Sequence, residues 1–169
     1  MNYRRLFVPG GFVFITIVTY KRIPILIEHV RLLKQSYYNV TKYYDFRLIA
    51  YSVQPDHIHC IIKPSCIEDY PKNIKSFKYS VTKMFNVGLV KPTYKNLWQN
   101  RYWEHTLRDE DDLNKHLDYI HYNPVKHGYV KAVKDWEYSS FHEFVQENLY
   151  EIHWGNNTDI KDIIDMNIE

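Results

Sequence analysis

Two histidines separated by one residue stand near the middle of the chain, in the segment His57-Ile58-His59. A β-strand alternates its side chains between two faces, so a strand here would point both imidazoles to one face and Ile58 and Cys60 to the other. Two imidazoles about 7 Å apart along a strand can converge on one metal ion. Taken alone, this pattern is more typical of an exposed pair of histidines.

A second group of polar side chains recurs at helical spacing later in the chain. Asp112, His116, Tyr119 and Asn123 are separated by four, three and four residues, which aligns them on one face of a helix. The apolar stripe of that helix would consist of Leu113, Leu117 and Ile120. Because Pro124 disfavours helical backbone in the residue before it, the helix is predicted to end at Asn123, with the amide free to bind a ligand. Periodicity alone favours a solvent-facing tyrosine and an asparagine that merely ends the helix.

Together, the two groups suggest phosphoryl chemistry. A phenol with a pKa near 10 is a poor nucleophile at neutral pH unless a cation or a base assists it. Two histidines and one amide oxygen would leave open positions on Mg²⁺ or Mn²⁺ for water and a phosphate oxygen. A structural zinc site would require four ligands, and alternation directs the Cys60 thiol away from the histidines.

The elements that must position these residues follow from periodicity and turn residues. The expected strands are 12–20, 46–53, 57–63 and 98–107, and the expected helices are 24–44, part of 67–87, 109–123 and 136–148. This order predicts an α+β fold in which helices pack on a sheet that contains antiparallel strands.

The composition is that of one globular domain: 169 residues, 45% of them hydrophobic. No apolar run reaches the roughly 18–20 residues of a membrane-spanning helix, and the two cysteines form no CxxC motif. We therefore expect a cytoplasmic protein with reduced thiols. Residues 141–169 hold seven acidic residues against Lys161 alone, or −6, which leaves +8 for the preceding 140 residues. A basic body suits a polyanionic partner, although ordinary surface charge would give the same balance.

Six segments in sequence order resemble the REP-associated tyrosine transposases, which belong to the HUH (His-hydrophobic-His) single-tyrosine DNA nucleases. They are YRR (3–5), GGFVFIT (10–16), QPDHIHC (54–60), LWQNRYWEH (97–105), DYIHYNPVKHG (118–128) and WEYSSF (136–141). The resemblance implies a ferredoxin-like antiparallel sheet with packed helices in a domain spanning 1–145, followed by an acidic C-terminal extension, 146–169.

The same resemblance implies roles for particular residues. His57 and His59 correspond to metal ligands, Tyr119 to the nucleophile and Asn123 to a third ligand. Insertion-sequence relatives have glutamine at the last position, so asparagine gives a shorter reach. Gln54 replaces the apolar residue, often methionine, that usually precedes the turn.

The implied reaction is cleavage and rejoining of single-stranded DNA beside a palindromic REP-type hairpin, through a 5′-phosphotyrosine intermediate and a divalent metal, Mg²⁺ or Mn²⁺. The expected protein is a nucleoid-associated bacterial monomer, with a dimer as the other option. Two alternatives remain open: a non-catalytic protein that binds hairpin DNA or RNA, and a metallohydrolase that activates water.

Further residues are candidates for DNA contacts. Basic side chains near the first strand and polar or aromatic ones before the fourth could hold phosphates or stack on bases, or could serve solubility and the core. The candidates are Arg4, Arg5, Lys21, Arg22, Trp98, Arg101 and Tyr102, with Trp103 as a further stacking residue.

Overall fold

A four-stranded antiparallel sheet forms the centre of the molecule in this computed structural model, which describes residues 11–87, 96–156 and 166. The strands are β1 (Val13–Val18), β2 (Phe46–Val53), β3 (His57–Pro64) and β4 (Trp103–Thr106). Their order across the sheet is β2-β3-β1-β4, with every neighbouring pair antiparallel. With one helical crossover after β1 and another after β3, this is the ferredoxin-like arrangement, and the predicted fold class is confirmed.

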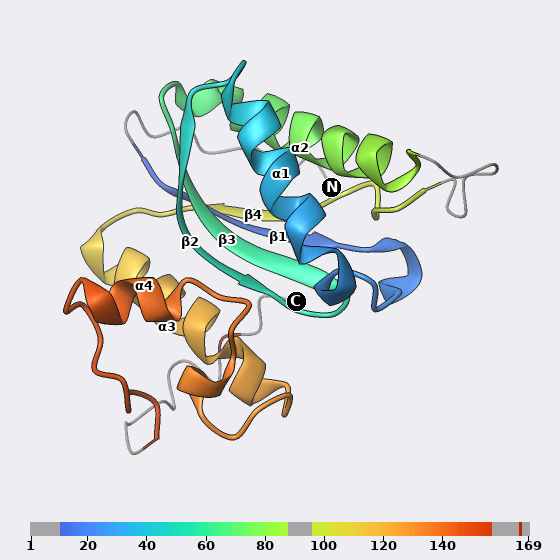
Figure 1. The fold of residues 1–169 in the computed structure, drawn as a ribbon. Coiled ribbons are helices and arrows are strands. Elements are labelled where there is room, and N and C mark those ends of the chain that lie inside the picture. The colour runs from blue at the N-terminus through green and yellow to red at the C-terminus, as the bar shows by residue number, and fades with distance from the viewer. Residues whose placement is uncertain (1–10, 88–95, 157–165, 167–169) are drawn as a thin grey trace.

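Helices cover both faces of the sheet (Figure 1). The helices α1 (Val30–Thr41) and α2 (Tyr70–Phe85) lie on one face, where they also pack against each other. The other face is covered by α3 (Glu110–Lys126) and α4 (Phe141–Gln146). The histidine face of β3 is therefore buried beneath helices.

Strand alternation divides the interior into two cores. On β3, Ile58, Cys60 and Ile62 belong to the core beneath α1 and α2, whereas Ile61 belongs to the core shared with α3 and α4. The predicted division of β3 into an apolar face and a histidine face is confirmed. Cys60 is buried on the apolar face and makes no disulfide, as expected.

Several predicted boundaries of helices and strands are wrong, because the hydrophobic patterns extend beyond the residues that form these elements. The first helix begins at Val30, not at residue 24, since a 3₁₀ turn precedes it. The fourth strand has four residues instead of ten, and Trp98 forms only an isolated bridge with Thr19. The last helix begins at Phe141, after an irregular segment that the pattern placed inside it.

Helix α3 continues through Pro124 to Lys126, so the predicted end at Asn123 is also wrong. Proline lacks an N–H group and strains a helix interior, but its cost is limited in the final turn. Here His127 N donates to Asn123 O at 3.0 Å, and Gly128 follows with a φ of +74° that ends the helix. Because Asn123 lies inside a helix with neither residue 123 nor 124 exposed, its amide is held by packing and not at a frayed end.

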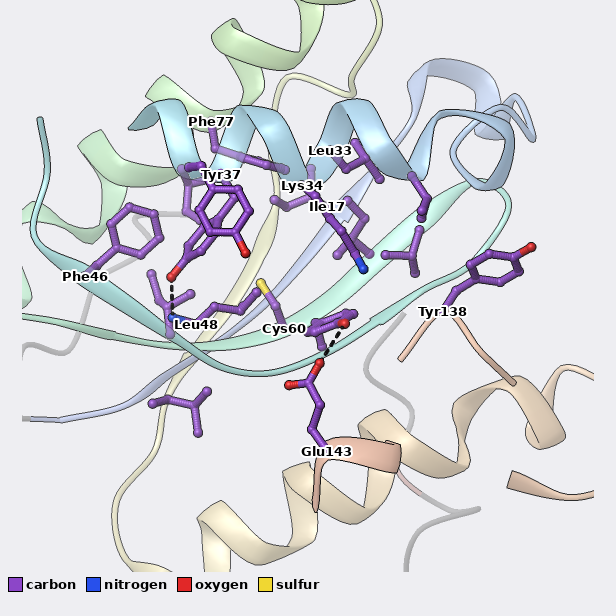
Figure 2. Close-up of a pocket in the computed structure, with 18 of the residues that line it drawn as sticks. Ile17, Leu33, Lys34, Tyr37, Phe46, Leu48, Cys60, Phe77, Tyr138 and Glu143 are labelled. Atoms are coloured by element: carbon purple, nitrogen blue, oxygen red, sulfur yellow. Dashed lines mark hydrogen bonds between the residues drawn. The ribbon is translucent and has the colours of Figure 1, made fainter. Parts of the chain in front are cut away.

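A cavity of about 310 Å³ lies between α1 and the sheet (Figure 2). Its walls include Leu33, Phe46 and Cys60, and at one edge the Tyr51 hydroxyl donates to Glu143 of α4 at 3.2 Å. Burial and the neighbouring carboxylate raise the pKa of Tyr51 to about 12, so this phenol stays protonated. The cavity is on the face opposite the histidines.

Among the described residues, no helix is long and apolar enough to cross a membrane.

Candidate active site

Two imidazoles and one phenol meet between β3 and α3. The ring centroids of His57 and His59 are 4.8 Å apart, closer than their spacing along the strand, and the Tyr119 ring lies 5.2 Å from His59. All three side chains are at most 1% exposed. The fold thus brings the two histidines of β3 together with the tyrosine of α3.

One hydrogen bond fixes the orientation of His57. Its Nδ1 lies 2.6 Å from Asp56 Oδ1, so Nδ1–H donates to the carboxylate. The opposite ring nitrogen, Nε2, is then the atom with the lone pair. It is buried and has no hydrogen-bond partner among the residues that the structure describes. A buried acceptor without a partner costs free energy unless something binds it.

Asp56 is itself held by Arg22, whose Nη1 lies 3.1 Å from Asp56 Oδ2. Burial of Asp56 opposes ionisation, but the hydrogen bonds and charges of His57 and then Arg22 outweigh it and lower its pKa. Lys21 and Arg22 have φ values of 55° and 53°, a left-handed conformation that non-glycine residues seldom adopt. Thr19 anchors this turn by bonding through its backbone N and hydroxyl to Asp56 O. Strain in the turn is therefore offset by contacts that place Arg22 against Asp56.

His59 is oriented from the neighbouring strand. Thr16 is its partner in the β1–β3 register, and Thr16 Oγ1 shares a 2.8 Å hydrogen bond with His59 Nδ1. The Phe14 ring stacks on His59 with centroids 5.6 Å apart and also contacts Tyr119 at 6.0 Å. In both histidines, Nδ1 makes the orienting hydrogen bond, and Nε2 is on the opposite side of the ring.

Tyr119 and Asn123 lie one turn apart on α3 and are both fully buried. The reading of the tyrosine as solvent-facing, which periodicity alone favoured, is wrong. Lys126 Nζ lies 5.1 Å from the centre of the Tyr119 ring, so a cation sits against the phenol.

The donor set suits a hard or borderline divalent cation. Neutral imidazole nitrogens, with their other ring nitrogen bonded to a carboxylate or hydroxyl, are the usual form of histidine ligands in proteins. The buried Nε2 of His57 meets that description directly. Cys60 points into the other core, so no thiolate competes. The two oriented imidazoles therefore fit a metal site with nitrogen ligands.

Another group of possible ligands, His105, Asp112 and His116, lies at the start of α3, with its ligand atoms within 4.8 Å of one another. Hydrogen bonds already occupy these atoms: Asp112 Oδ2 accepts from His105 Nε2 at 2.9 Å and from Arg108 N at 3.0 Å. His116 Nδ1 lies 2.7 Å from the Asp112 carbonyl oxygen and donates to it. We therefore interpret this group as a hydrogen-bonded network that holds the first turn of α3 to β4.

Asp112 should stabilise the fold through that network. Burial opposes its ionisation, but bonds from Arg108 and His105 outweigh this and lower its pKa to about 2. A lowered pKa in the folded state gives stability that is present above the unfolded-state value near 4 and is lost as the pH falls towards 2. Asp112→Asn should reduce the free energy of unfolding at pH 7 by about 2 kcal/mol, measured by urea denaturation. The exposed neighbour gives the control, Asp111→Asn, which should change it by less than about 0.5 kcal/mol; equal effects would contradict the role of the network.

The candidate DNA contacts are distributed unevenly. Arg4 and Arg5 lie outside the described residues, whereas Lys21 and Arg101 are exposed. Arg22 is the ion-pair partner of Asp56. The two aromatic candidates lie inward: Trp98 is buried and donates to Lys78 O, and Tyr102 is half-buried with Lys78 Nζ 6.0 Å from its ring.

Sequence reasoning missed Phe14 and Thr16, which surround His59. The signal was available, because alternation along the expected first strand puts residues 14 and 16 on one face. What the sequence could not give is the pairing of that strand with β3, which sets Thr16 opposite His59. His127, directly after the end of α3, lies edge-on to His57 with ring centroids 5.3 Å apart.

Comparisons with known proteins agree with one another. Residues 12–123 match the family model described as "Transposase IS200 like". The REP-associated tyrosine transposase of Escherichia coli is 38% identical over 161 residues, covering 94% of this chain and 93% of its own length. A Haemophilus influenzae protein, assigned provisionally to the same family by its name, is 41% identical over 169 residues, covering 95% and 96%.

A solved structure described as a REP-associated tyrosine transposase bound to a REP hairpin has the same fold, with a TM-score of 0.83 and 36% identity over 94% of both chains. The family match covers β1, the histidine pair and α3 as far as Asn123. On these grounds the chain belongs to the REP-associated tyrosine transposases, within the IS200-like transposases.

Proposed function

We propose that this protein cleaves and rejoins single-stranded DNA beside a palindromic hairpin, with Tyr119 as the nucleophile. The observation that carries the proposal is the meeting of the Tyr119 ring with the His57–His59 pair, 5.2 Å from His59, in a family of transposases. His59 and Tyr119 are 60 residues apart in the sequence, so the fold accounts for their contact.

The proposed step is a transesterification at a DNA phosphate. The phenolic oxygen of Tyr119 bonds to phosphorus as its proton passes to solvent, and the bond between phosphorus and the 3′ oxygen breaks. The departing oxygen takes up a proton and becomes a 3′-hydroxyl, while the 5′-phosphate stays attached to Tyr119. Attack by a second 3′-hydroxyl reverses these changes and joins two strands without an external energy source. Because the ring is fully buried, bound DNA must displace side chains that cover it.

His57, His59 and Asn123 would hold a divalent cation, Mg²⁺ or Mn²⁺, beside the phenol. When bound, such an ion withdraws negative charge from the non-bridging oxygens of the phosphate. Asp56 and Thr16 orient the two imidazoles through Nδ1. Lys126 Nζ lies 5.1 Å from the centre of the Tyr119 ring, which places a positive charge beside the site where a phosphate would bind.

A hairpin substrate is supported by the related solved structure, which is bound to a REP hairpin. The basic body of this chain, +8 outside residues 141–169, fits a polyanionic strand. We further propose that residues 1–145 form the transposase domain and 146–169 an acidic extension. Tyr150 and Trp154 of that extension pack on the core shared with α3.

A denaturing gel tests the proposal. The protein is incubated with single-stranded oligonucleotides that carry a hairpin, with Mn²⁺ or with a chelator. The expected result is a protein–DNA band that survives denaturation, depends on Mn²⁺ and is accompanied by a released 3′-hydroxyl strand. Cleavage without a covalent band would indicate a hydrolase, and binding without cleavage a hairpin-binding protein; either result would overturn the proposal.

A further inference from the structure

Trp103 is an exposed indole on the catalytic face of the sheet. It is 42% exposed, whereas the two other aromatic residues of its segment, Trp98 and Tyr102, are buried and half-buried. Tryptophan is enriched at binding interfaces, because its indole offers a large apolar face together with a polar N–H group. The structure thus shows which of the three aromatic residues of this segment is exposed.

The register of the sheet places Trp103 on the same face as the histidines. Trp103 pairs with Thr16 across β1 and β4, and Thr16 pairs with His59 across β1 and β3. Paired residues of adjacent strands point to the same face, so these three side chains form one row. Since β4 is the edge strand, the indole stands at the rim of that row, where a DNA strand could reach it.

A single ring connects Trp103 to the proposed catalytic residues. Phe14 packs edge-on against Trp103 with centroids 5.5 Å apart, and the same ring contacts His59 at 5.6 Å and Tyr119 at 6.0 Å. The buried Phe14 therefore supports the indole from beneath and fixes its place relative to the nucleophile. A rigid, supported and exposed aromatic ring is the arrangement that stacks on unpaired bases.

We propose that Trp103 stacks on an unpaired base of the DNA strand near the phosphate that Tyr119 attacks. This inference rests on the proposed function, because it assigns a position in the same site. Trp103 is here a positioning residue: it holds the strand in register with the phenol and does not touch the reacting atoms. Stacking on a base face requires an unpaired nucleotide and tolerates any of the four bases.

The test measures base stacking without cleavage. Protein carrying Tyr119→Phe is titrated into hairpin oligonucleotides that contain the fluorescent base 2-aminopurine at each position of the single-stranded arm in turn. Trp103→Leu removes the indole and keeps an apolar side chain, whereas Trp103→Phe keeps an aromatic ring. Tyr79→Ala is the matched control, because Tyr79 is 69% exposed and lies on α2, on the opposite face of the sheet.

The 2-aminopurine fluorescence should be quenched at one or two adjacent positions by protein that keeps Trp103 and by the Trp103→Phe variant. The Trp103→Leu variant should not quench it. Base–aromatic stacking is worth enough that Trp103→Leu should raise the dissociation constant roughly tenfold, with Tyr79→Ala unchanged. In protein that retains Tyr119, Trp103→Leu should raise the DNA concentration for half-maximal adduct by a similar factor and leave the rate at saturation within about threefold.

Quenching that is unchanged in Trp103→Leu, or absent at every position, would overturn this assignment. Because the fluorescence experiment uses protein without the nucleophile, its outcome is independent of adduct formation. A protein that forms the adduct but shows no stacking that depends on Trp103 would retain the proposed function and lose this inference.

Discussion

Tyr119→Phe should abolish covalent attachment of DNA, with a loss of at least about 10³-fold in adduct yield on a denaturing gel, the scale seen when a nucleophile is removed. The phenylalanine ring keeps the buried volume and its contacts with Phe14 and His59. Only the hydroxyl oxygen is lost, so the fold and hairpin binding should be retained. Loss of the adduct would then report chemistry and not unfolding.

The control is needed because the chain has 16 tyrosines. Tyr122→Phe changes another buried tyrosine of the same helix, whose ring packs on Trp154. This variant should form adduct at the wild-type level. If Tyr119→Phe still formed a covalent band, peptide mapping of the attached nucleotide would identify another nucleophile, and the role given to Tyr119 would be wrong.

Strand alternation was the most reliable guide from sequence to site. It correctly divided His57 and His59 from Ile58 and Cys60, because a β3 covered on both sides keeps its two faces distinct. Helical spacing likewise aligned His116, Tyr119 and Asn123. What spacing could not tell is which stripe of α3 would be buried, since polar residues pack inward only when a polar surface faces them.

The polar surface that faces α3 here is the row of histidines on β3. The stripe with Tyr119 is buried, whereas the apolar stripe is buried only in part: Ile120 is fully buried, but Leu113 and Leu117 are half-buried. Apolar character alone therefore did not identify the whole buried face of this helix. The prediction that the helix ends before Pro124 was wrong for a related reason. Packing of the last turn outweighed the tendency of proline to end a helix.

The contact between Arg22 and Asp56 was beyond reach of sequence patterns. It depends on a left-handed turn at Lys21 and Arg22, two residue types that seldom adopt that conformation. From sequence, both residues were candidates for phosphate contacts, with solubility as the alternative role. The structure shows that Arg22 also orients the carboxylate that holds His57, so its substitution would alter the site as well as the surface charge.

His57→Ala should also abolish the adduct, by at least about 10²-fold, with hairpin affinity within about threefold of wild type. The substitution removes the buried Nε2 acceptor that lacks a hydrogen-bond partner among the described residues. Because the effect is assigned to cation binding, it should appear without DNA. Titration of Mn²⁺ followed by electron paramagnetic resonance should show a site in the wild type that is lost in His57→Ala.

His105→Ala provides the decisive comparison, because it removes a histidine from the other cluster of possible metal ligands. Its Nε2 already bonds to Asp112, so we expect reduced stability but undiminished Mn²⁺ binding and adduct formation. The reverse pattern, with Mn²⁺ lost in His105→Ala and kept in His57→Ala, would move the cation to the start of α3. In that case Tyr119 would lie beside two imidazoles that serve some purpose other than binding an ion, and the phosphoryl chemistry assigned to this face would fail.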